Sequence, residues 1–331
     1  MSAPPHNMTS RNLYTSPSRA PIICGSYPAV APPQLRTCEW CSKAPRELRR
    51  CAACNTALYC DRECQKAAWK RHKTSCKVIA NTVTGQPHEK FVLAELRRIG
   101  FSSLADFSEA LADFKEAHSW AIASIVQAAI HREGVLDWMQ NKGTTEALCF
   151  RLAPLSPRER RIHRDPGSAF RINSVEFSAS EIVDDMREFR SGFNFASHAE
   201  RAQNSDYVGA ALVLYDVEGL TMKISGTYAQ YRPTAPELAS PEEQRAIFGD
   251  MMMLCVGCIN MGCPLRVLEG NDPIVALPGR FSRVRGKWTW KPLFSSWEDY
   301  RGGDAGLDEV LGRLKLSNVS PAQLMTAVSR L

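Results

Sequence analysis

Long apolar runs are missing from this chain of 331 residues, and their absence excludes a membrane-spanning or secreted protein. The longest apolar stretch, Trp120–Ile130, is interrupted by Ser124 and Gln127, and a membrane helix needs ~18 or more apolar residues. Prolines break up the first 30 residues, so no signal-peptide core is present. No clear Lys/Arg-rich nuclear import cluster is present either. We therefore expect an intracellular protein without membrane contact, in the nucleus or the cytoplasm.

Acidic residues are absent from residues 1–37, which instead hold seven of the twenty prolines and five serines. A segment of this composition cannot bury enough apolar surface to offset the entropy cost of ordering its backbone. We expect residues 1–37 to form a disordered tail.

Cysteine is concentrated in one segment, because seven of the twelve lie within the 39 residues from Cys38 to Cys76. Intracellular thiols are normally reduced, so the clustering indicates metal binding rather than disulfide bonds. The segment has few apolar residues from which to build a core, and bound metal must therefore supply its folding energy.

The cysteines of this segment have the spacing of zinc ligands. A C-x2-C pair places two thiolates on one tight turn, where a tetrahedral Zn²⁺ can bind both. His72 and Cys76 are four residues apart, so a helix with Asp61 as its N-cap would place them on one face. Eight ligands make two tetrahedral sites, and the spacing alone leaves open whether these are consecutive or interleaved. The ligands are Cys38, Cys41, Cys51, Cys54, Cys60, Cys64, His72 and Cys76.

Residues 38–76 resemble the MYND zinc finger in all eight ligands, the Tyr59-Cys60 pair, the Cys64-Gln65 step and Trp69. The resemblance implies an interleaved cross-brace that holds two structural Zn²⁺ ions. The implied ligands are Cys38, Cys41, Cys60 and Cys64 for the first ion, and Cys51, Cys54, His72 and Cys76 for the second.

The resemblance also implies binding of proline-containing peptides, typically of Pro-x-Leu-x-Pro type, rather than of DNA. Gln65 and Trp69 match the helix residues that contact the peptide in characterised members. Ala52 stands where those members have a small polar residue, a departure that affects the peptide preference. An exposed Trp beside an amide on a rigid helix also suits a polyproline II ligand on physical grounds. We expect an adaptor protein, with transcriptional regulation as the setting that the family suggests.

The basic charge of the finger is largely cancelled once the metal is counted. Nine Lys/Arg and four acids give residues 38–76 a charge of +5, and seven thiolates with two Zn²⁺ lower it to +2. Binding of nucleic acid by counterion release usually involves about six or more phosphate contacts, so nucleic acid is an unlikely partner. Three basic residues of the finger helix are candidate rim charges that would steer an acidic partner: Arg62, Lys66 and Lys70.

Two features outside the finger have alternative interpretations. The basic and aromatic segment 279–291, as a strand pair turning near Gly286, could stack nucleic-acid bases, although an amphipathic hairpin covering a core is favoured. The second cysteine group lacks a fourth zinc ligand, so we expect buried thiols in a Met-rich core. Its members are Cys255, Cys258 and Cys263.

A methyltransferase is an alternative function, because MYND fingers also occur within SET-domain lysine methyltransferases. Those enzymes have an Asn-His-x-Cys-x-Pro-Asn motif, and the nearest match here, Asn260–Pro264, lacks the His and the spacing. In that group the finger interrupts the catalytic domain, whereas only the tail precedes it here. Four protein ligands at each zinc leave no open position for water. We expect no enzyme, with a SET-like methyltransferase of degenerate motifs as an alternative.

A linker over residues 77–88 is expected to lead into an α+β domain over residues 89–331. Its first part is helical, with Ser103 as an N-cap and an apolar stripe that includes a core histidine, His118, and stops at Gly134. Strands and helices are mixed after about residue 147. Predicted strands cover 148–152, 170–177, 207–217 and 220–229, and predicted helices begin at Ser178, Ser240 and Ser320.

Overall fold

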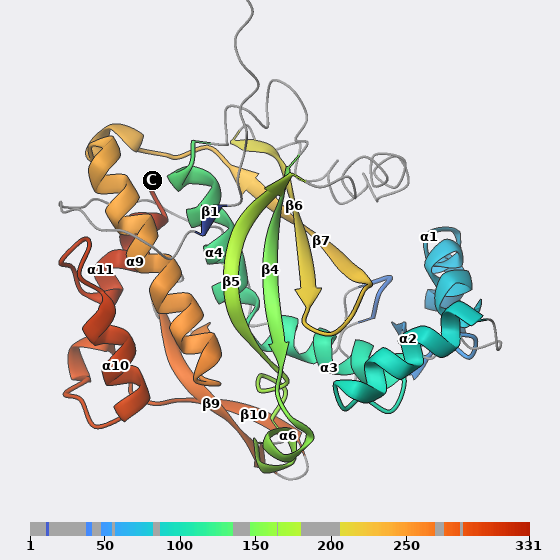
Figure 1. Ribbon diagram of the computed structural model, residues 1–331. Helices are drawn as coiled ribbons and strands as arrows, with labels where there is room; N and C mark the ends of the chain where they lie inside the picture. Colours follow the sequence, from blue (N-terminus) through green and yellow to red (C-terminus); the bar gives the residue numbers. More distant parts are fainter. Residues whose placement is uncertain are drawn as a thin grey trace, which may run out of the picture.

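A small finger lies beside a larger domain built from helices and two sheets (Figure 1). The larger domain confirms the predicted α+β class. Of the predicted disordered tail, residues 1–10 and 13–37 lie outside the described residues, while Arg11–Asn12 form strand β1. The computed structural model describes residues 11–12, 38–41, 48–54, 57–81, 87–134, 146–163, 165–179, 206–268, 275–284 and 287–331.

The finger consists of a two-stranded hairpin and one long helix. Strand β2 (Arg49–Arg50) pairs antiparallel with β3 (Leu58–Tyr59), and helix α1 (Arg62–Asn81) follows. The Asp61 side chain accepts a hydrogen bond from the Cys64 backbone N–H at 2.8 Å, which confirms Asp61 as the N-cap.

The segment that we expected to be a linker is partly helical. Helix α1 continues through its first residues to Asn81, and α2 (Pro87–Arg98) begins before residue 88. Gly100 then ends α2 with a positive φ of 83°, a conformation that glycine adopts without a steric penalty.

The predicted helical stripe up to Gly134 is two helices, α3 (Leu104–Ala117) and α4 (Ser119–Arg132). The Ser103 side chain caps α3, as predicted. The chain bends at His118, whose buried ring has its Nε2 2.9 Å from the Gly167 carbonyl oxygen. A ring nitrogen that donates to a loop carbonyl joins the two helices to the loop before β5, and confirms His118 as a hydrogen-bonded core histidine.

The main sheet has five strands in the order β1-β5-β4-β6-β7. Strands β4 and β6 are parallel, and the other neighbours are antiparallel. Ser178 pairs with Ala147 inside this sheet, so the prediction that a helix begins at Ser178 is wrong. The four long strands are β4 (Glu146–Pro154), β5 (Phe170–Ala179), β6 (Tyr207–Val217) and β7 (Lys223–Tyr231).

Helix α9 (Pro241–Asn260) lies between β5 and the two C-terminal helices, and it also packs against α4 (Figure 1). It begins with a capping box in which Ser240 and Glu243 satisfy each other's backbone N–H groups, as its sequence predicted. At its other end, the Asn260 side chain bonds both the N–H and the C=O of Ile172 in β5. The C-terminal helices are α10 (Ala305–Arg313) and α11 (Pro321–Val328), the second starting at a Ser320 capping box.

A second, three-stranded sheet has the order β10-β9-β8, all antiparallel. Its strands β9 and β10 confirm the predicted hairpin over 279–291. The strands are β8 (Leu265–Val267), β9 (Ala276–Val284) and β10 (Lys287–Pro292); the short helices are α6 (Pro157–His163), η1 (Pro236–Leu238) and η2 (Trp297–Asp299).

Two buried histidines make the stability of the larger domain depend on pH. Burial lowers the pKa of His118 and of His131 to about 4, although each ring nitrogen faces a backbone carbonyl oxygen that opposes the shift. The folded state keeps both rings neutral, while the unfolded chain takes up protons near pH 6.5. The free energy of unfolding should therefore fall as the pH drops from 7 to 5, by about 2 kcal/mol per histidine.

Urea denaturation between pH 7 and 5 tests this pH dependence. His118→Gln and His131→Gln keep a side-chain N–H donor but cannot titrate, so each should reduce the slope of stability against pH. Comparing each variant with the wild type at every pH removes the contribution of the other titrating groups. An unchanged slope in both variants would contradict the prediction.

Candidate metal centre

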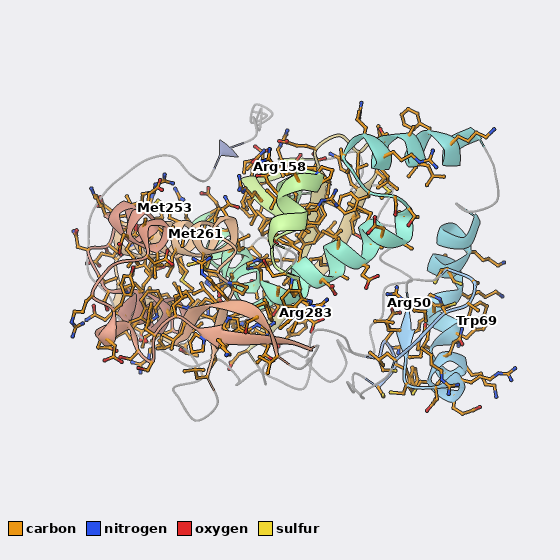
Figure 2. The ribbon with its side chains drawn as sticks, turned by 90° about the horizontal axis from the view of Figure 1, so that it is seen from below. Arg50, Trp69, Arg158, Met253, Met261 and Arg283 are labelled. Carbon is orange, nitrogen blue, oxygen red and sulfur yellow. The ribbon has the colours of Figure 1, made fainter. Side chains whose placement is uncertain are left out.

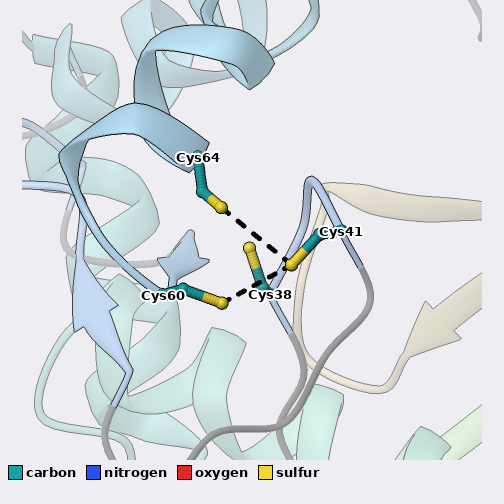
Figure 3. Close-up of side chains that lie close together, drawn as sticks. All are labelled: Cys38, Cys41, Cys60 and Cys64. Atoms are coloured by element: carbon teal, nitrogen blue, oxygen red, sulfur yellow. Dashed lines mark hydrogen bonds between the residues drawn. The ribbon is translucent and has the colours of Figure 1, made fainter.

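The first cluster brings together four cysteines from three parts of the finger (Figure 3). Cys38 and Cys41 come from the first turn, Cys60 follows β3, and Cys64 lies in the first turn of α1. The Cys41 sulfur is 3.5 Å from that of Cys60 and 3.9 Å from that of Cys64. A tetrahedron of thiolates at ~2.3 Å from Zn²⁺ has edges of ~3.8 Å, so these positions fit one zinc ion.

The second cluster consists of Cys51 and Cys54, from the turn after β2, with His72 and Cys76 on α1. The sulfurs of Cys51 and Cys76 are 3.7 Å apart, and the Cys54 sulfur is 3.5 Å from Nε2 of His72. One imidazole nitrogen and three thiolates at these spacings fit a second tetrahedral Zn²⁺. All four side chains are buried, which leaves little access for water.

The clusters interleave along the chain, which confirms the cross-brace that the family resemblance implied. The first and third cysteine pairs form one site. The second cysteine pair forms the other site together with His72 and Cys76. Helix α1 contributes to both sites through Cys64, His72 and Cys76. Two metal ions therefore hold this helix against the rest of the finger.

Backbone N–H groups prepare one thiol of each site for metal. Burial raises the pKa of Cys38 and of Cys51, but N–H groups of the adjoining turns outweigh it, and each pKa falls to about 6. Burial and neighbouring sulfur atoms raise the pKa of Cys60 to about 11 and that of Cys64 and Cys76 to about 12. Zinc binding must displace protons from these three thiols, so zinc affinity falls as the pH drops.

Two aromatic contacts orient the histidine ligand. Tyr59 is buried, and its ring centre lies 5.9 Å from that of His72 in an edge-to-face arrangement. The ring centre of Trp69 lies 6.0 Å from that of His72. These contacts restrict the imidazole rotamer that presents Nε2 to the second zinc site.

Gln65 contacts the second zinc site. This contact was not expected from the sequence, because Gln65 directly follows Cys64, a ligand of the first site. Its amide nitrogen lies 3.4 Å from the Cys51 sulfur. A zinc-bound thiolate only accepts hydrogen bonds, so the NH₂ group must face the metal site and the amide oxygen must face away. The side chain is partly buried in this position.

Trp69 is 41% exposed, whereas Tyr59, which also contacts the His72 ring, is buried. Figure 2 shows Trp69 on the side of α1 that faces away from the larger domain, with Arg50 on the opposite side. The Arg50 guanidinium makes a 2.7 Å ion pair with Glu109 of α3. The finger therefore faces the larger domain with one side and presents Trp69 on the other.

A second exposed aromatic residue lies in the first zinc-binding turn. Trp40 is 45% exposed, and the Arg71 guanidinium lies 4.6 Å from the centre of its ring. The sequence pattern did not indicate this cation–π pair, because the two residues are 31 positions apart and only the cross-brace brings them together. Ala52, the third predicted peptide contact, is exposed in the turn of the second site.

The second cysteine group lies in the core of the larger domain. Cys255, Cys258 and Cys263 are each completely buried, as predicted. Burial raises the pKa of Cys263 to about 11 and that of the other two further. Among the described residues, the ligand groups close enough to hold a metal are the two of the finger.

The aromatic side chains of the β9–β10 hairpin contact other groups of the larger domain. The Trp290 indole N–H donates to the Pro264 carbonyl oxygen at 3.0 Å. Arg283 lies over the ring of Trp288 at 5.0 Å, and Arg266 lies over Phe281 at the same distance. The rings that could stack bases are thus partly covered by arginines of the same domain.

These two interleaved sites define a cross-braced two-zinc finger, and residues 38–76 match the family model of the MYND finger. No curated protein and no solved structure matches the chain. The chain therefore contains a MYND finger, a zinc-dependent module of protein–protein interaction, at residues 38–76. Within the described residues, no helix is long and apolar enough to cross a membrane.

Replacing one ligand tests the assignment of the two sites. Cys64→Ser removes a thiolate from the first site, so zinc per chain should fall from two to one or fewer, because a three-ligand site binds zinc far more weakly. Zinc is measured by a colorimetric chelator after gel filtration. Cys263→Ser is the matched control, since it changes a buried thiol of the larger domain and should leave two zinc ions. Retention of two ions by Cys64→Ser would refute the assignment.

Proposed function

We propose that the finger binds proline-containing segments of partner proteins and that the chain acts as an adaptor. The observation that carries this proposal is the exposed Trp69 ring on a helix held by two metal sites. Large exposed aromatic rings on rigid elements are typical of binding surfaces. An indole face suits polyproline II segments, whose rigid backbone loses little entropy on binding.

Gln65 and Trp69 are four residues apart on α1 and so project from the same face of the helix. The hydrogen bond from its NH₂ group to Cys51 turns the Gln65 amide oxygen outward as an acceptor. Proline has no N–H group, so the donor must be a non-proline residue of the ligand. We therefore expect a ligand with at least one non-proline residue between its prolines, which the Pro-x-Leu-x-Pro type provides.

Ala52 further restricts which ligand residue the finger would accept at this turn, because its methyl group makes no hydrogen bonds. The contact at this turn would be apolar or through the backbone. Arg62, Lys66 and Lys70 are exposed on α1, and Lys66 forms an exposed ion pair with Glu63. Acidic residues beside the proline motif would thus increase the association rate.

Both zinc sites have four protein ligands, which is typical of structural rather than catalytic zinc. We propose that the chain is not an enzyme and that its role is recognition, in transcriptional regulation inside the cell. Residues 89–331 would then position the finger or bind further partners of the same assembly.

Removing the exposed indole tests the proposed surface. Trp69→Ala should weaken binding of a synthetic Pro-x-Leu-x-Pro peptide at least about tenfold, because loss of an aromatic hot-spot contact at an interface costs about 2 kcal/mol or more. Fluorescence anisotropy of the labelled peptide measures the affinity, and the zinc content verifies that both sites remain intact. Phe91→Ala is the control, since Phe91 is 54% exposed on α2 outside the finger. An equal change of peptide affinity in both variants would refute the proposal that the Trp69 surface binds the peptide.

The two atoms of the Gln65 amide can be tested separately. Gln65→Glu keeps an outward acceptor but brings a carboxylate beside the Cys51 thiolate, so zinc should dissociate faster. Gln65→Leu removes both the donor and the acceptor, so peptide affinity should also fall several-fold, since a lost hydrogen bond costs about 1 kcal/mol. Zinc release to a chelator and peptide anisotropy are measured on the same samples. Unchanged peptide affinity in Gln65→Leu would contradict a role of the amide oxygen.

A further inference from the structure

The chain contains a segment of the ligand type proposed above, shortly before its own finger. Residues 28–32 read Pro28-Ala29-Val30-Ala31-Pro32, two prolines four positions apart with an apolar residue midway. We propose that this segment occupies the Gln65–Trp69 surface of its own finger and competes with partner peptides. The inference rests on the proposed function, because it names a ligand for the same surface.

The composition of the segment matches the chemistry of the surface. Prolines favour the polyproline II conformation, and Val30 would supply an apolar side chain to the exposed Trp69 ring. Ala29 and Ala31 retain N–H groups, which the outward oxygen of Gln65 can accept. The segment carries no acid, so it forms no ion pair with the basic residues of α1. A partner peptide with acidic flanks would therefore bind more tightly and displace it.

The connection is long enough for contact within one chain. Five residues separate Pro32 from Cys38, and five extended residues span up to about 17 Å. The sulfur of Cys38 lies within 4.8 Å of that of Cys64, because both belong to the first zinc site. Trp69 is five residues beyond Cys64, an advance of about 7.5 Å along the helix. The segment can therefore reach the indole without any rearrangement of the finger.

Attachment at both ends favours the segment of the same chain over that of a second copy. On the C-terminal side of the segment, the chain continues to Cys38, a ligand of the first zinc site. On the N-terminal side, Arg11 and Asn12 pair with Phe177 and Glu176 of β5. The fifteen residues between Asn12 and Pro28 span up to about 50 Å. Short tethers raise the effective concentration of a ligand to the millimolar range, so even a weak segment would occupy the surface most of the time.

A photo-crosslinker at position 30 tests the contact directly, in the zinc-loaded full-length chain. We replace Val30 by a photoreactive benzophenone amino acid, irradiate, and identify the product by mass spectrometry. The expected product joins position 30 to residues 62–73 of α1 within one chain, at a yield independent of protein concentration. The same amino acid at Ser18, a control position in the tail, should not crosslink to α1. Absence of the product from position 30, or a yield that rises with concentration, would overturn the inference.

A competition measurement separates this inference from the proposed function. Pro28→Ala/Val30→Ser/Pro32→Ala should bind a labelled Pro-x-Leu-x-Pro peptide about tenfold more tightly than the wild type, because it removes a competitor that occupies ~90% of the surface. Pro17→Ala, the matched control in the tail, should behave as wild type. Equal, Trp69-dependent affinity in all three chains would overturn the inference while the proposed function stands. If no chain binds the peptide, the proposed function fails, and the crosslink alone decides whether the tail contacts the helix.

Discussion

The finger depends on one constraint, the attachment of α1 to both zinc sites. Cys64 at the start of the helix belongs to the first site, and His72 and Cys76, two and three turns later, belong to the second. The remaining core of the finger is small, consisting of Ala57, Tyr59 and Ala68 among the cysteines. Metal coordination therefore replaces the apolar core that a segment of this size cannot build.

The two metal sites also set the direction of the side chains on α1. With the helix held by its metal ligands in the first turn and in the middle, Gln65 turns toward Cys51 while Trp69 remains exposed. The opposite side of the finger meets α3 through the ion pair of Arg50 and Glu109. An exposed ion pair contributes at most about 1 kcal/mol, so it orients the finger without making the two parts one folding unit.

The larger domain is stabilised by different physics. Its main core is an apolar cluster around α4, α9 and the inner faces of both sheets, separate from the residues of the finger, and a smaller cluster lies on β4 and β6 at Ala147, Cys149, Leu212 and Leu214. Buried polar groups in it have specific partners: Asn260 extends the hydrogen bonding of β5, and Asp250 accepts from the backbone of Leu316 and Ser317. The cysteines of α9 serve in this core as protonated apolar side chains and belong to neither of the two ligand clusters.

The local features of this protein follow from sequence patterns of a few residues. The zinc ligands, the caps at Asp61, Ser103, Ser240 and Ser320, and the hairpin of β9 and β10 are all predictable, because each depends on residues at most a few positions apart. The error at Ser178 and the missed break at His118 have the opposite cause. A strand partner or a loop carbonyl distant in the sequence overrides the local helix signal.

The sequence by itself determined which eight residues can hold zinc and which of them form pairs, since a C-x2-C turn or a helical four-residue step places two ligands together whatever the rest of the chain does. Only the tertiary structure decided that the pairs interleave, that Gln65 faces Cys51, and that Arg71 covers Trp40. These contacts depend on the path of the chain between distant positions. Spacing along the sequence does not specify that path until metal and packing select one arrangement.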